Sequence, residues 1–283
     1  MIVTRFAPSP TGYLHLGHAF AAITAYETAK RNAGRFRLRI EDIDRSRCRT
    51  EFEGAIFDDL HWLGLEWEEP VLRQSDRLET YRAALAKLGA QGLLYPCFCT
   101  RGQIAAEIAR SAEAPHGPEG ALYPGTCRQL TEAERQSRIQ SGAAYALRLD
   151  VKAAAQHAGD IQFEERGCGP HGERGTIAAH PALSGDIVLA RKDIPASYHL
   201  AVVLDDAFQG VTQVTRGNDL FAATHFQRLL QSLLHLPAPA YAHHRLILDE
   251  RGRKLSKRDN AVTLRSLREE GVPPAEIRER LGP

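Results

Sequence analysis

Two histidines near the N-terminus, His15 and His18, are the first residues whose type and spacing suggest chemistry. They form the pattern H-x-G-H after a short apolar segment, residues 2–7, that predicts a buried strand. Pro8 and Pro10 end that strand because proline cannot donate to a sheet ladder. The sequence then becomes helical, and the start of a helix attracts anions through unpaired N–H groups and its dipole. The pattern therefore predicts a phosphate-binding turn.

A basic run, Lys254-Leu255-Ser256-Lys257-Arg258, lies far along the chain. It follows an apolar segment, residues 246–249, that predicts a strand, and a turn over residues 250–252. Alone, such a run is typical of a solvated surface. Lys254 and Lys257 become candidates for phosphate chemistry only in combination with the histidine pair.

Arg5 and Arg216 are each predicted at the carboxyl end of a strand, the second of which covers residues 211–215. A guanidinium group there can hold a carboxylate through two parallel hydrogen bonds. Two such groups predict a pocket for a substrate with two carboxylates. Glu41 follows another predicted strand, residues 36–40, and ligands of open α/β sheets bind beyond the carboxyl ends of strands.

Three cysteines, Cys97, Cys99 and Cys127, surround one loop that is rich in glycine and proline. Thiol ligands around one loop suggest a tetrahedral zinc site. The chemistry of the residues leaves the fourth ligand open, with His116 as the default because imidazole is a common metal ligand. Three reduced, metal-free cysteines are the alternative, because C-x-C is less diagnostic than C-x-x-C.

The alternation of helices with short strands predicts an α/β fold, a Rossmann-like doubly wound parallel sheet. The first helix is expected from Ala19, with Gly34 as its stop. We divide the chain into four parts. They are the first half of the catalytic domain (1–96), a cysteine-containing insertion (97–180), the second half (181–249), and the lysine-rich loop with a short helical tail (250–283).

Composition sets limits on the class of protein. Hydrophobic residues make up 43% and charged residues 25%, and the net charge is +1, so any contact with nucleic acid must come from a local patch. The sequence contains no run of 18 apolar residues, which argues against a membrane span. It begins directly with the predicted strand and shows no signal peptide, so we expect a cytoplasmic protein.

Together, the histidine and lysine patterns resemble the HIGH and KMSKS motifs of class I aminoacyl-tRNA synthetases. Other segments resemble the glutamyl and glutaminyl branch of that family, and the resemblance spans nearly the whole chain. These segments are Arg5 to His18, Arg39-Ile40-Glu41-Asp42-Ile43-Asp44, Tyr198 to Asp206, and Arg216-Gly217-Asn218-Asp219-Leu220.

The resemblance implies that the protein activates L-glutamate with ATP and magnesium, and that the insertion holds an acceptor nucleic acid. It implies a glutamate-binding set made of Arg5, Ala7, Ser9, Glu41, Tyr198 and Arg216. It implies ATP-binding and catalytic roles for His15, His18 and Lys257, with Lys254 in support. Because the family pattern is C-x-C…Y-x-x-x-C, it also implies that Tyr123 is the fourth zinc ligand.

The acceptor is expected to follow from the length of the chain. Only 25 residues come after Arg258, and we expect no anticodon-binding domain among them. The resemblance therefore implies a monomeric enzyme that binds the anticodon stem-loop of tRNA(Asp) and attaches glutamate to its queuosine base. Asn218 occupies a position where charging glutamyl enzymes usually carry Glu. Two alternatives stay open: a compact glutamyl-tRNA synthetase that charges tRNA(Glu), and an adenylate-forming enzyme or nucleotidyltransferase that never binds RNA.

Overall fold

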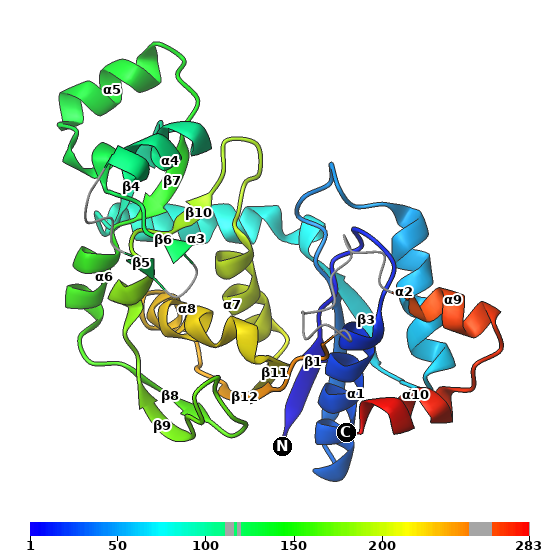
Figure 1. Ribbon diagram of the computed structural model, residues 1–283. Coiled ribbons are helices and arrows are strands. Elements are labelled where there is room, and N and C mark those ends of the chain that lie inside the picture. Colours follow the sequence, from blue (N-terminus) through cyan, green and yellow to red (C-terminus); the bar gives the residue numbers. More distant parts are fainter. Residues whose placement is uncertain (111–115, 118–119, 249–261, 283) are drawn as a thin grey trace.

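A short buried strand, β1 (Val3–Phe6), begins a three-stranded parallel sheet of the order β1-β2-β3. The computed structural model describes residues 1–110, 116–117, 120–248 and 262–282 (Figure 1). β1 pairs in parallel with β2 (Arg35–Ile40), which pairs in parallel with β3 (Glu68–Arg73). The outer edge of β1 lies beside β11 (Gln213–Gly217), because the backbone N–H of Thr212 donates to the carbonyl of Val3 over 3.0 Å.

The sheet continues beyond β11. β11 pairs in parallel with β12 (Ala240–His244), β12 pairs in parallel with β8 (Gln162–Glu165), and β8 pairs antiparallel with β9 (Gly175–Ala178). The early strands β2 and β3 thus lie on one side of β1 and the later strands on the other, so the strand order reverses between β1 and β11. The predicted α/β fold with a parallel sheet is confirmed.

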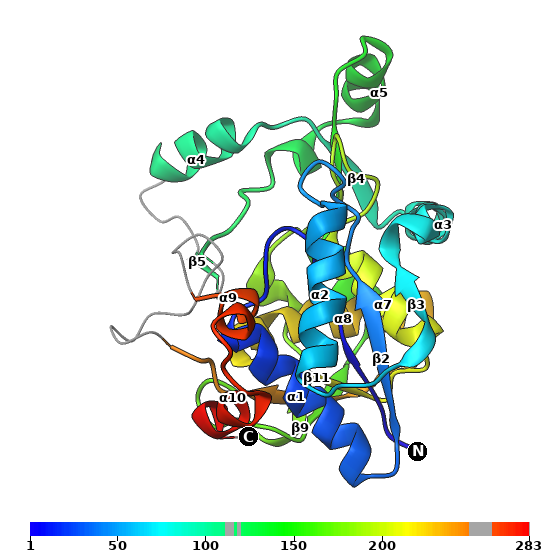
Figure 2. The same ribbon diagram turned by 90° about the vertical axis from the view of Figure 1, so that its right-hand side faces the viewer.

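Helices connect the strands and pack against them. The α-helices are α1 (Leu16–Arg31), α2 (Thr50–Trp62), α3 (Leu78–Ala90), α4 (Arg101–Arg110), α5 (Glu132–Gln140), α6 (Val151–Ala158), α7 (Tyr198–Phe208), α8 (Phe221–Leu234), α9 (Leu264–Glu269) and α10 (Pro274–Leu281). Short 3-10 helices are η1 (Gln74–Arg77), η2 (Thr126–Gln129), η3 (Pro181–Ser184) and η4 (Asn218–Leu220). Figure 2 shows α1 and α2 side by side over the β1–β3 part of the sheet.

Among the predicted boundaries, the end of the first helix and the position of a later strand are wrong, each for a physical reason. Gly34 does not stop α1, which ends earlier; a Cβ at Gly34 would lie 2.2 Å from the carbonyl oxygen of Ile2, so glycine is needed there for close approach to β1. The strand predicted over residues 246–249 lies instead at 240–244, as β12. The prediction followed the apolar run, whereas β12 ends in two histidines, of which His243 is fully buried in a polar network.

The segment between the two halves of the sheet forms a small sheet of its own. It contains β10 (Val188–Ala190), β7 (Ala146–Leu149) and β4 (Leu94–Cys97) in that antiparallel order, and a short pair, β5 (His116–Gly117) and β6 (Gly120–Ala121). α4 and α5 extend away from the main sheet, at the upper left of Figure 1. However, β8 and β9, which belong to the predicted insertion, extend the main sheet through β12. The four-part division of the chain therefore stays a prediction.

The two C-terminal helices pack back onto the N-terminal half. Four of their side chains are buried in the same core as α1 and α2: Leu264, Leu267, Ile277 and Leu281. The backbone N–H of Leu264 donates to the carbonyl of Leu14 over 2.8 Å, and Thr263 forms a bridge with His15. α9 thus begins beside the histidine turn. Within the described ranges, no helix is long and apolar enough to cross a membrane.

Candidate active site and metal centre

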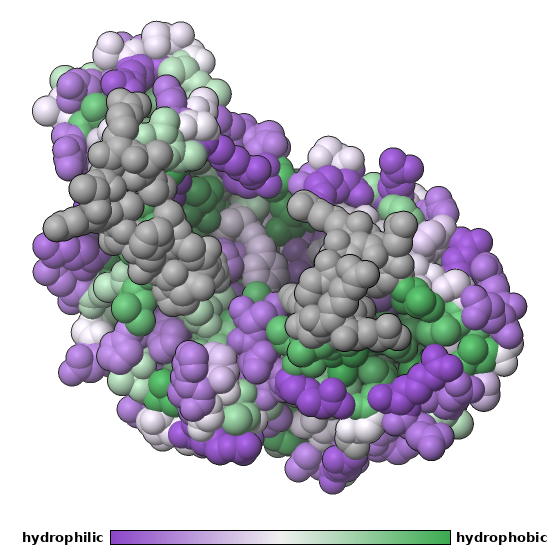
Figure 3. Space-filling view, viewed as in Figure 1, coloured by the Kyte–Doolittle hydropathy of each residue, from purple (hydrophilic) through white to green (hydrophobic). Residues whose placement is uncertain are grey.

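A cavity of about 250 Å³ opens between the carboxyl ends of β1 and β11. In Figure 3 the surface is hollowed between the upper-left lobe and the right-hand part of the molecule. Open α/β sheets bind ligands where the strand order reverses, and this cavity lies at that point. Seven residues predicted to bind glutamate or ATP line it: Arg5, Ala7, His15, His18, Glu41, Tyr198 and Arg216.

His15 and His18 cap α1 with their own rings, which is why the helix begins at Leu16 and not at the predicted Ala19. Nδ1 of His15 accepts the N–H of Gly17 over 3.1 Å, and Nδ1 of His18 accepts the N–H of His15 over 3.2 Å. In a neutral imidazole, an accepting Nδ1 leaves the proton on Nε2. The first turn of α1 contains no acidic residue. Two Nε2–H donors at a positive helix end suit phosphate oxygens.

A cluster of four charged side chains lies against the same cavity. Asp206, near the end of α7, accepts hydrogen bonds from Nε of Arg5 over 3.1 Å and from Nη1 of Arg39 over 2.7 Å. Nη2 of Arg39 donates to Glu41 over 3.2 Å. Burial favours a higher pKa for Asp206, but Arg5 and Arg39 outweigh it and hold that pKa below its usual range. Burial raises the pKa of Glu41 to about 6, against the opposing charges of Arg39 and Arg5.

Arg216, at the end of β11, is buried with neutral partners. Its Nε donates to Nε2 of His243 over 3.1 Å, its Nη1 to Gln227 over 2.8 Å, and its Nη2 to Thr224 over 2.7 Å. The residue is 6% exposed. Among the described residues, none of its polar contacts or ion pairs is with a carboxylate. Because an unmatched buried charge is costly, this arrangement favours an anionic ligand.

The other predicted site residues lie in three places. Tyr198, the first residue of α7, faces the cavity, and burial raises the pKa of its hydroxyl. Ser9 lies outside this cavity, in an adjoining one of about 410 Å³ that shares Glu41 and Tyr198 with it. Lys254 and Lys257 lie outside the described residues. The predicted zinc ligands are gathered in a separate site.

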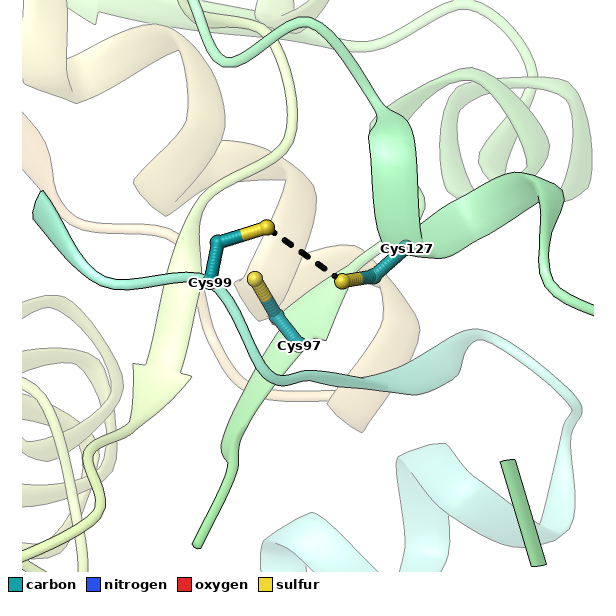
Figure 4. Close-up of side chains that lie close together, drawn as sticks. All are labelled: Cys97, Cys99 and Cys127. Atoms are coloured by element: carbon teal, nitrogen blue, oxygen red, sulfur yellow. Dashed lines mark hydrogen bonds between the residues drawn. The ribbon is translucent and has the colours of Figure 1, made fainter. Parts of the chain in front are cut away.

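That separate site is formed by Cys97 at the end of β4, Cys99 in the next loop and Cys127 in η2 (Figure 4). The three sulfur atoms lie within 4.8 Å of one another, and Sγ of Cys99 is 3.4 Å from Sγ of Cys127. The hydroxyl of Tyr123 is 3.5 Å from Sγ of Cys97 and 3.7 Å from Sγ of Cys99. These four side chains converge, whereas the side chain of His116 lies outside the described residues.

The spacing can be compared with that of a tetrahedral zinc site. Zinc–sulfur bonds of about 2.3 Å and a zinc–oxygen bond of about 2.1 Å place sulfur and oxygen ligands about 3.6 Å apart. The distances from Tyr123 to Cys97 and Cys99 agree with that value. The Tyr123 hydroxyl also accepts the backbone N–H of Cys127 over 2.8 Å, and the guanidinium of Arg148 lies 3.9 Å from the centre of its ring. The sulfur atoms of Cys99 and Cys127, 3.4 Å apart, are slightly closer than the about 3.8 Å between two sulfur ligands of tetrahedral zinc, so the donor set fits zinc after a small adjustment of side chains.

Several residues that support the cavity wall were missed by the sequence predictions. Asp206 was included only as part of a family pattern, although it joins Arg5 to Arg39. Glu165 and His243, which hold Arg216 through a chain of hydrogen bonds, were not considered. They are 78 positions apart, and only the parallel pairing of β8 with β12 brings them together. The one local feature that could have indicated their role is an acidic residue, Glu165, within a short predicted strand.

Comparisons with known proteins agree with this geometry. Residues 1–282 match the family described as tRNA synthetases class I (E and Q), catalytic domain. The chain is 51% identical to a glutamyl-Q tRNA(Asp) synthetase of Rhodobacter capsulatus, over 99% of this chain and 100% of that protein. It is 42% identical to a glutamate–tRNA ligase of Aquifex aeolicus, over 96% of this chain but 55% of that protein.

Among solved structures, a glutamate-tRNA synthetase from Elizabethkingia anophelis superposes with a TM-score of 0.75 at 29% identity. The match covers 91% of this chain and 53% of that one, so the chain spans about half the length of the solved synthetase. The chain therefore belongs to the class I tRNA synthetases of the glutamate and glutamine branch, and it contains their catalytic domain.

Proposed function

We propose that this protein activates L-glutamate with ATP and transfers the glutamyl group to the queuosine base in the anticodon of tRNA(Asp). The observation that carries the proposal is the buried Arg216, whose protein partners are all neutral and which faces a cavity containing Glu41 and the start of α1. The relative from Rhodobacter capsulatus supports the acceptor, because its name specifies glutamyl-Q tRNA(Asp) and this chain covers its whole length.

In this proposal, the amino acid lies between charges of opposite sign. Arg216 and Arg5 face its side-chain carboxylate, with Tyr198 beside them. Glu41 holds the α-ammonium group, since it is ionised above a pKa of about 6 and is fixed by Arg39. Ala7 completes the wall of the cavity, and Ser9, from the adjoining cavity, reaches the α-carboxylate end of the ligand.

Activation then requires that the α-carboxylate oxygen attacks the α-phosphorus of ATP and that pyrophosphate leaves. The chain forms no covalent intermediate, so its residues act by positioning the reactants and by stabilising charge. His15 and His18 donate from Nε2 to phosphate oxygens at the positive end of α1. Lys257, with Lys254 in support, neutralises charge on the five-coordinate phosphorus, and magnesium accompanies the phosphates.

We also propose that Cys97, Cys99, Tyr123 and Cys127 hold one zinc ion. Support comes from the spacing of their donor atoms, which matches a tetrahedral site. All four ligands come from the loop region around β4 and η2, so zinc would tie that region together and have no part in the chemistry of glutamate. The segment that contains it would receive the anticodon stem-loop, and the working enzyme would be a monomer.

Charging of tRNA(Glu) is the second candidate function, because the Aquifex aeolicus glutamate–tRNA ligase is 42% identical to this chain. The two candidates share the first step and differ in the acceptor. In the first, a hydroxyl of a modified base attacks the mixed anhydride; in the second, a hydroxyl of the terminal ribose attacks it. The adenylate-forming enzyme that binds no RNA remains as an outcome of the same test.

The test has two stages. Exchange of labelled pyrophosphate into ATP with glutamate, without tRNA, measures activation. Labelled glutamate is then offered with individual purified tRNAs: tRNA(Asp) with and without queuosine, tRNA(Glu), and an isolated queuosine stem-loop. We expect label on queuosine-containing tRNA(Asp) and on the stem-loop, and retention after enzymatic removal of the terminal adenosine. Label on tRNA(Glu) that is lost with that adenosine would establish charging instead, and exchange without any transfer would favour the third function.

A further inference from the structure

Arg216 does not hold its position alone, because a buried chain of hydrogen bonds leads away from its guanidinium. Nε of Arg216 donates to Nε2 of His243 over 3.1 Å, and Nδ1 of His243 is 2.6 Å from Oε2 of Glu165. The side chains of His243 and Glu165 are both completely buried. None of the roles given above to the cavity residues uses these two groups.

The hydrogen bonds of Glu165 fix the orientation of its carboxylate. Its Oε1 accepts the backbone N–H of His243 over 2.9 Å and that of Gly167 over 2.8 Å. Its Oε2 therefore faces Nδ1 of His243 and can only accept from it. This places the ring proton of His243 on Nδ1 and leaves Nε2 as an acceptor. That tautomer is the one that Arg216 requires, because Nε of arginine is always a donor.

The guanidinium is thus held at all three nitrogens. His243 takes the N–H of Nε, Gln227 and Thr224 each take one N–H of the two Nη atoms, and the ring of Tyr241 lies 5.3 Å from the guanidinium carbon. Of the five N–H groups of Arg216, two have no hydrogen-bond partner among the residues that the structure describes. A guanidinium whose plane is fixed loses less conformational freedom when it binds a carboxylate, so its geometry adds to selectivity.

We propose that Glu165 and His243 are positioning residues for Arg216, and that they set the preference of the cavity for a carboxylate side chain over an amide. The inference rests on the proposed binding of glutamate at Arg216. The new element is that selectivity depends on the tautomer of His243. Glu165 determines this tautomer, although it lies on a strand that does not border the cavity. Neither residue needs to touch the substrate.

The first test is Glu165→Gln. The two backbone N–H groups retain the amide oxygen of the new side chain, so its NH₂ group faces Nδ1 of His243. The ring must then carry its proton on Nε2 and oppose the N–H of Arg216. We expect KM for glutamate to rise about tenfold or more, the scale of one hydrogen bond to a charged group, and the preference for glutamate over glutamine to fall by a similar factor. KM for ATP should change less than about twofold.

Glu164→Gln is the matched control. Glu164 is the adjacent residue on β8, but it is exposed, and among the described residues its side chain bonds only to the hydroxyl of Thr176 over 3.2 Å. The same change of charge at position 164 should leave KM for glutamate, KM for ATP and the preference for glutamate over glutamine as they are in the unmodified protein. If the two variants behave alike, or if Glu165→Gln raises KM for ATP as much as KM for glutamate, the residue is merely structural and the inference is wrong.

A second pair of variants separates positioning from packing. Gln at position 243 places an amide at the distance of Nε2 and can accept from Arg216. Asn at that position reaches only as far as Nδ1 and cannot. We therefore expect His243→Gln to keep most of the preference for glutamate and His243→Asn to lose about tenfold or more of it. Equal losses in the two variants would overturn the proposal.

A spectroscopic measurement is independent of activity. The Nδ1–H proton of His243 should give a downfield imidazole resonance that disappears in His243→Gln, disappears also in Glu165→Gln because the ring proton moves to Nε2, and is unchanged in Glu164→Gln. An Nε2-protonated ring in the unmodified protein would overturn the tautomer on which the chain depends. Absence of glutamate-dependent exchange by the unmodified protein would instead contradict the proposed function, and the resonance would still decide the tautomer.

Discussion

Asp206 is the charge on which both the fold and the cavity depend, and Asp206→Asn tests this directly. One carboxylate oxygen of Asp206 serves two arginines, Arg5 at 3.1 Å and Arg39 at 2.7 Å. Arg39 is completely buried, and Asp206 and Arg5 are each about 5% exposed. Replacement by Asn keeps the shape of the side chain and removes its charge, so two buried guanidinium groups must then share Glu41.

The expected loss of stability in Asp206→Asn follows from the number of arginines that Asp206 pairs with. Breaking a buried ion pair by removing one member costs about 3–5 kcal/mol. Asn retains an oxygen that can still accept one of the two hydrogen bonds, so we expect a loss of about 3 kcal/mol in the free energy of unfolding. For a domain of this size, each kcal/mol lowers Tm by about 2–4 °C, which gives a decrease of about 6–12 °C.

The pH dependence has a definite sign. The arginines hold the pKa of Asp206 below its unfolded value of about 3.9, so its contribution to stability is present above that value and is lost as pH falls through the folded pKa. Asp206 also helps to raise the pKa of Glu41 to about 6, so the difference in stability between the unmodified protein and Asp206→Asn should be constant only above about pH 7, where Glu41 is ionised in both proteins. It should shrink as pH falls through the folded pKa of Asp206.

The assay is urea unfolding, followed by fluorescence at pH 7.5 and again near pH 4, together with glutamate-dependent pyrophosphate exchange. Asp58→Asn is the matched control, because the side chain of Asp58 is 66% exposed and its carboxylate lies 3.8 Å from Arg268. That variant should stay within about 0.5 kcal/mol of the unmodified protein. An equally small effect of Asp206→Asn would refute the view that this carboxylate compensates two buried charges.

Three further predictions follow from other parts of the molecule. Both carboxylate oxygens of the buried Asp59 lack a hydrogen-bond partner among the described residues, and burial raises its pKa to about 6. Its contribution to stability is therefore full below about pH 4 and is lost as pH rises through 6. In urea unfolding, the stability of Asp59→Asn should increase relative to that of the unmodified protein between pH 5 and 7.5. A difference in stability between the two proteins that stays constant over this range would contradict the prediction. Metal analysis should find one zinc per chain in the unmodified protein and in the control Cys48→Ser. The zinc should be lost in the double variant Cys97→Ser with Cys99→Ser, and its retention there would exclude the site. Arg216→Ala should lower kcat/KM for glutamate by about 10²-fold or more while changing that for glutamine much less, and an unaltered preference would remove Arg216 from recognition.

Three charged residues of the cavity wall could be predicted because each was expected at the carboxyl end of a strand. Arg5, Glu41 and Arg216 were predicted at the ends of β1, β2 and β11, and in a parallel sheet all such ends lie on one edge. The two histidines were predicted from their place at a strand–helix junction. These predictions need only local patterns and the general geometry of parallel sheets. The roles of these residues toward ligands remain predictions.

The residues that support the wall could not be predicted in the same way. Glu165 and His243 meet only through pairing between β8 and β12, and Asp206 reaches Arg39 across 167 positions. The position of β12 was itself predicted wrongly. The apolar residues 246–249 predicted a strand there, whereas the strand of the structure, residues 240–244, buries His243 and not an apolar side chain at that position. Polar residues that are buried to hold other polar residues have no periodic pattern of their own.

The two arginines of the cavity differ in how their charge is balanced, and under the proposed function this difference would give each a separate part in recognition. Arg5 is paired with Asp206 before any ligand arrives, so its charge is matched and it contributes mainly shape and direction. Arg216 is held by a histidine, an amide and a hydroxyl, which fix its plane without matching its charge. A carboxylate side chain supplies the missing charge, whereas an amide leaves it unmatched and offers Arg216 an oxygen of weaker acceptor strength. Discrimination between glutamate and glutamine should therefore depend on Arg216 and on the neutral groups around it far more than on Arg5.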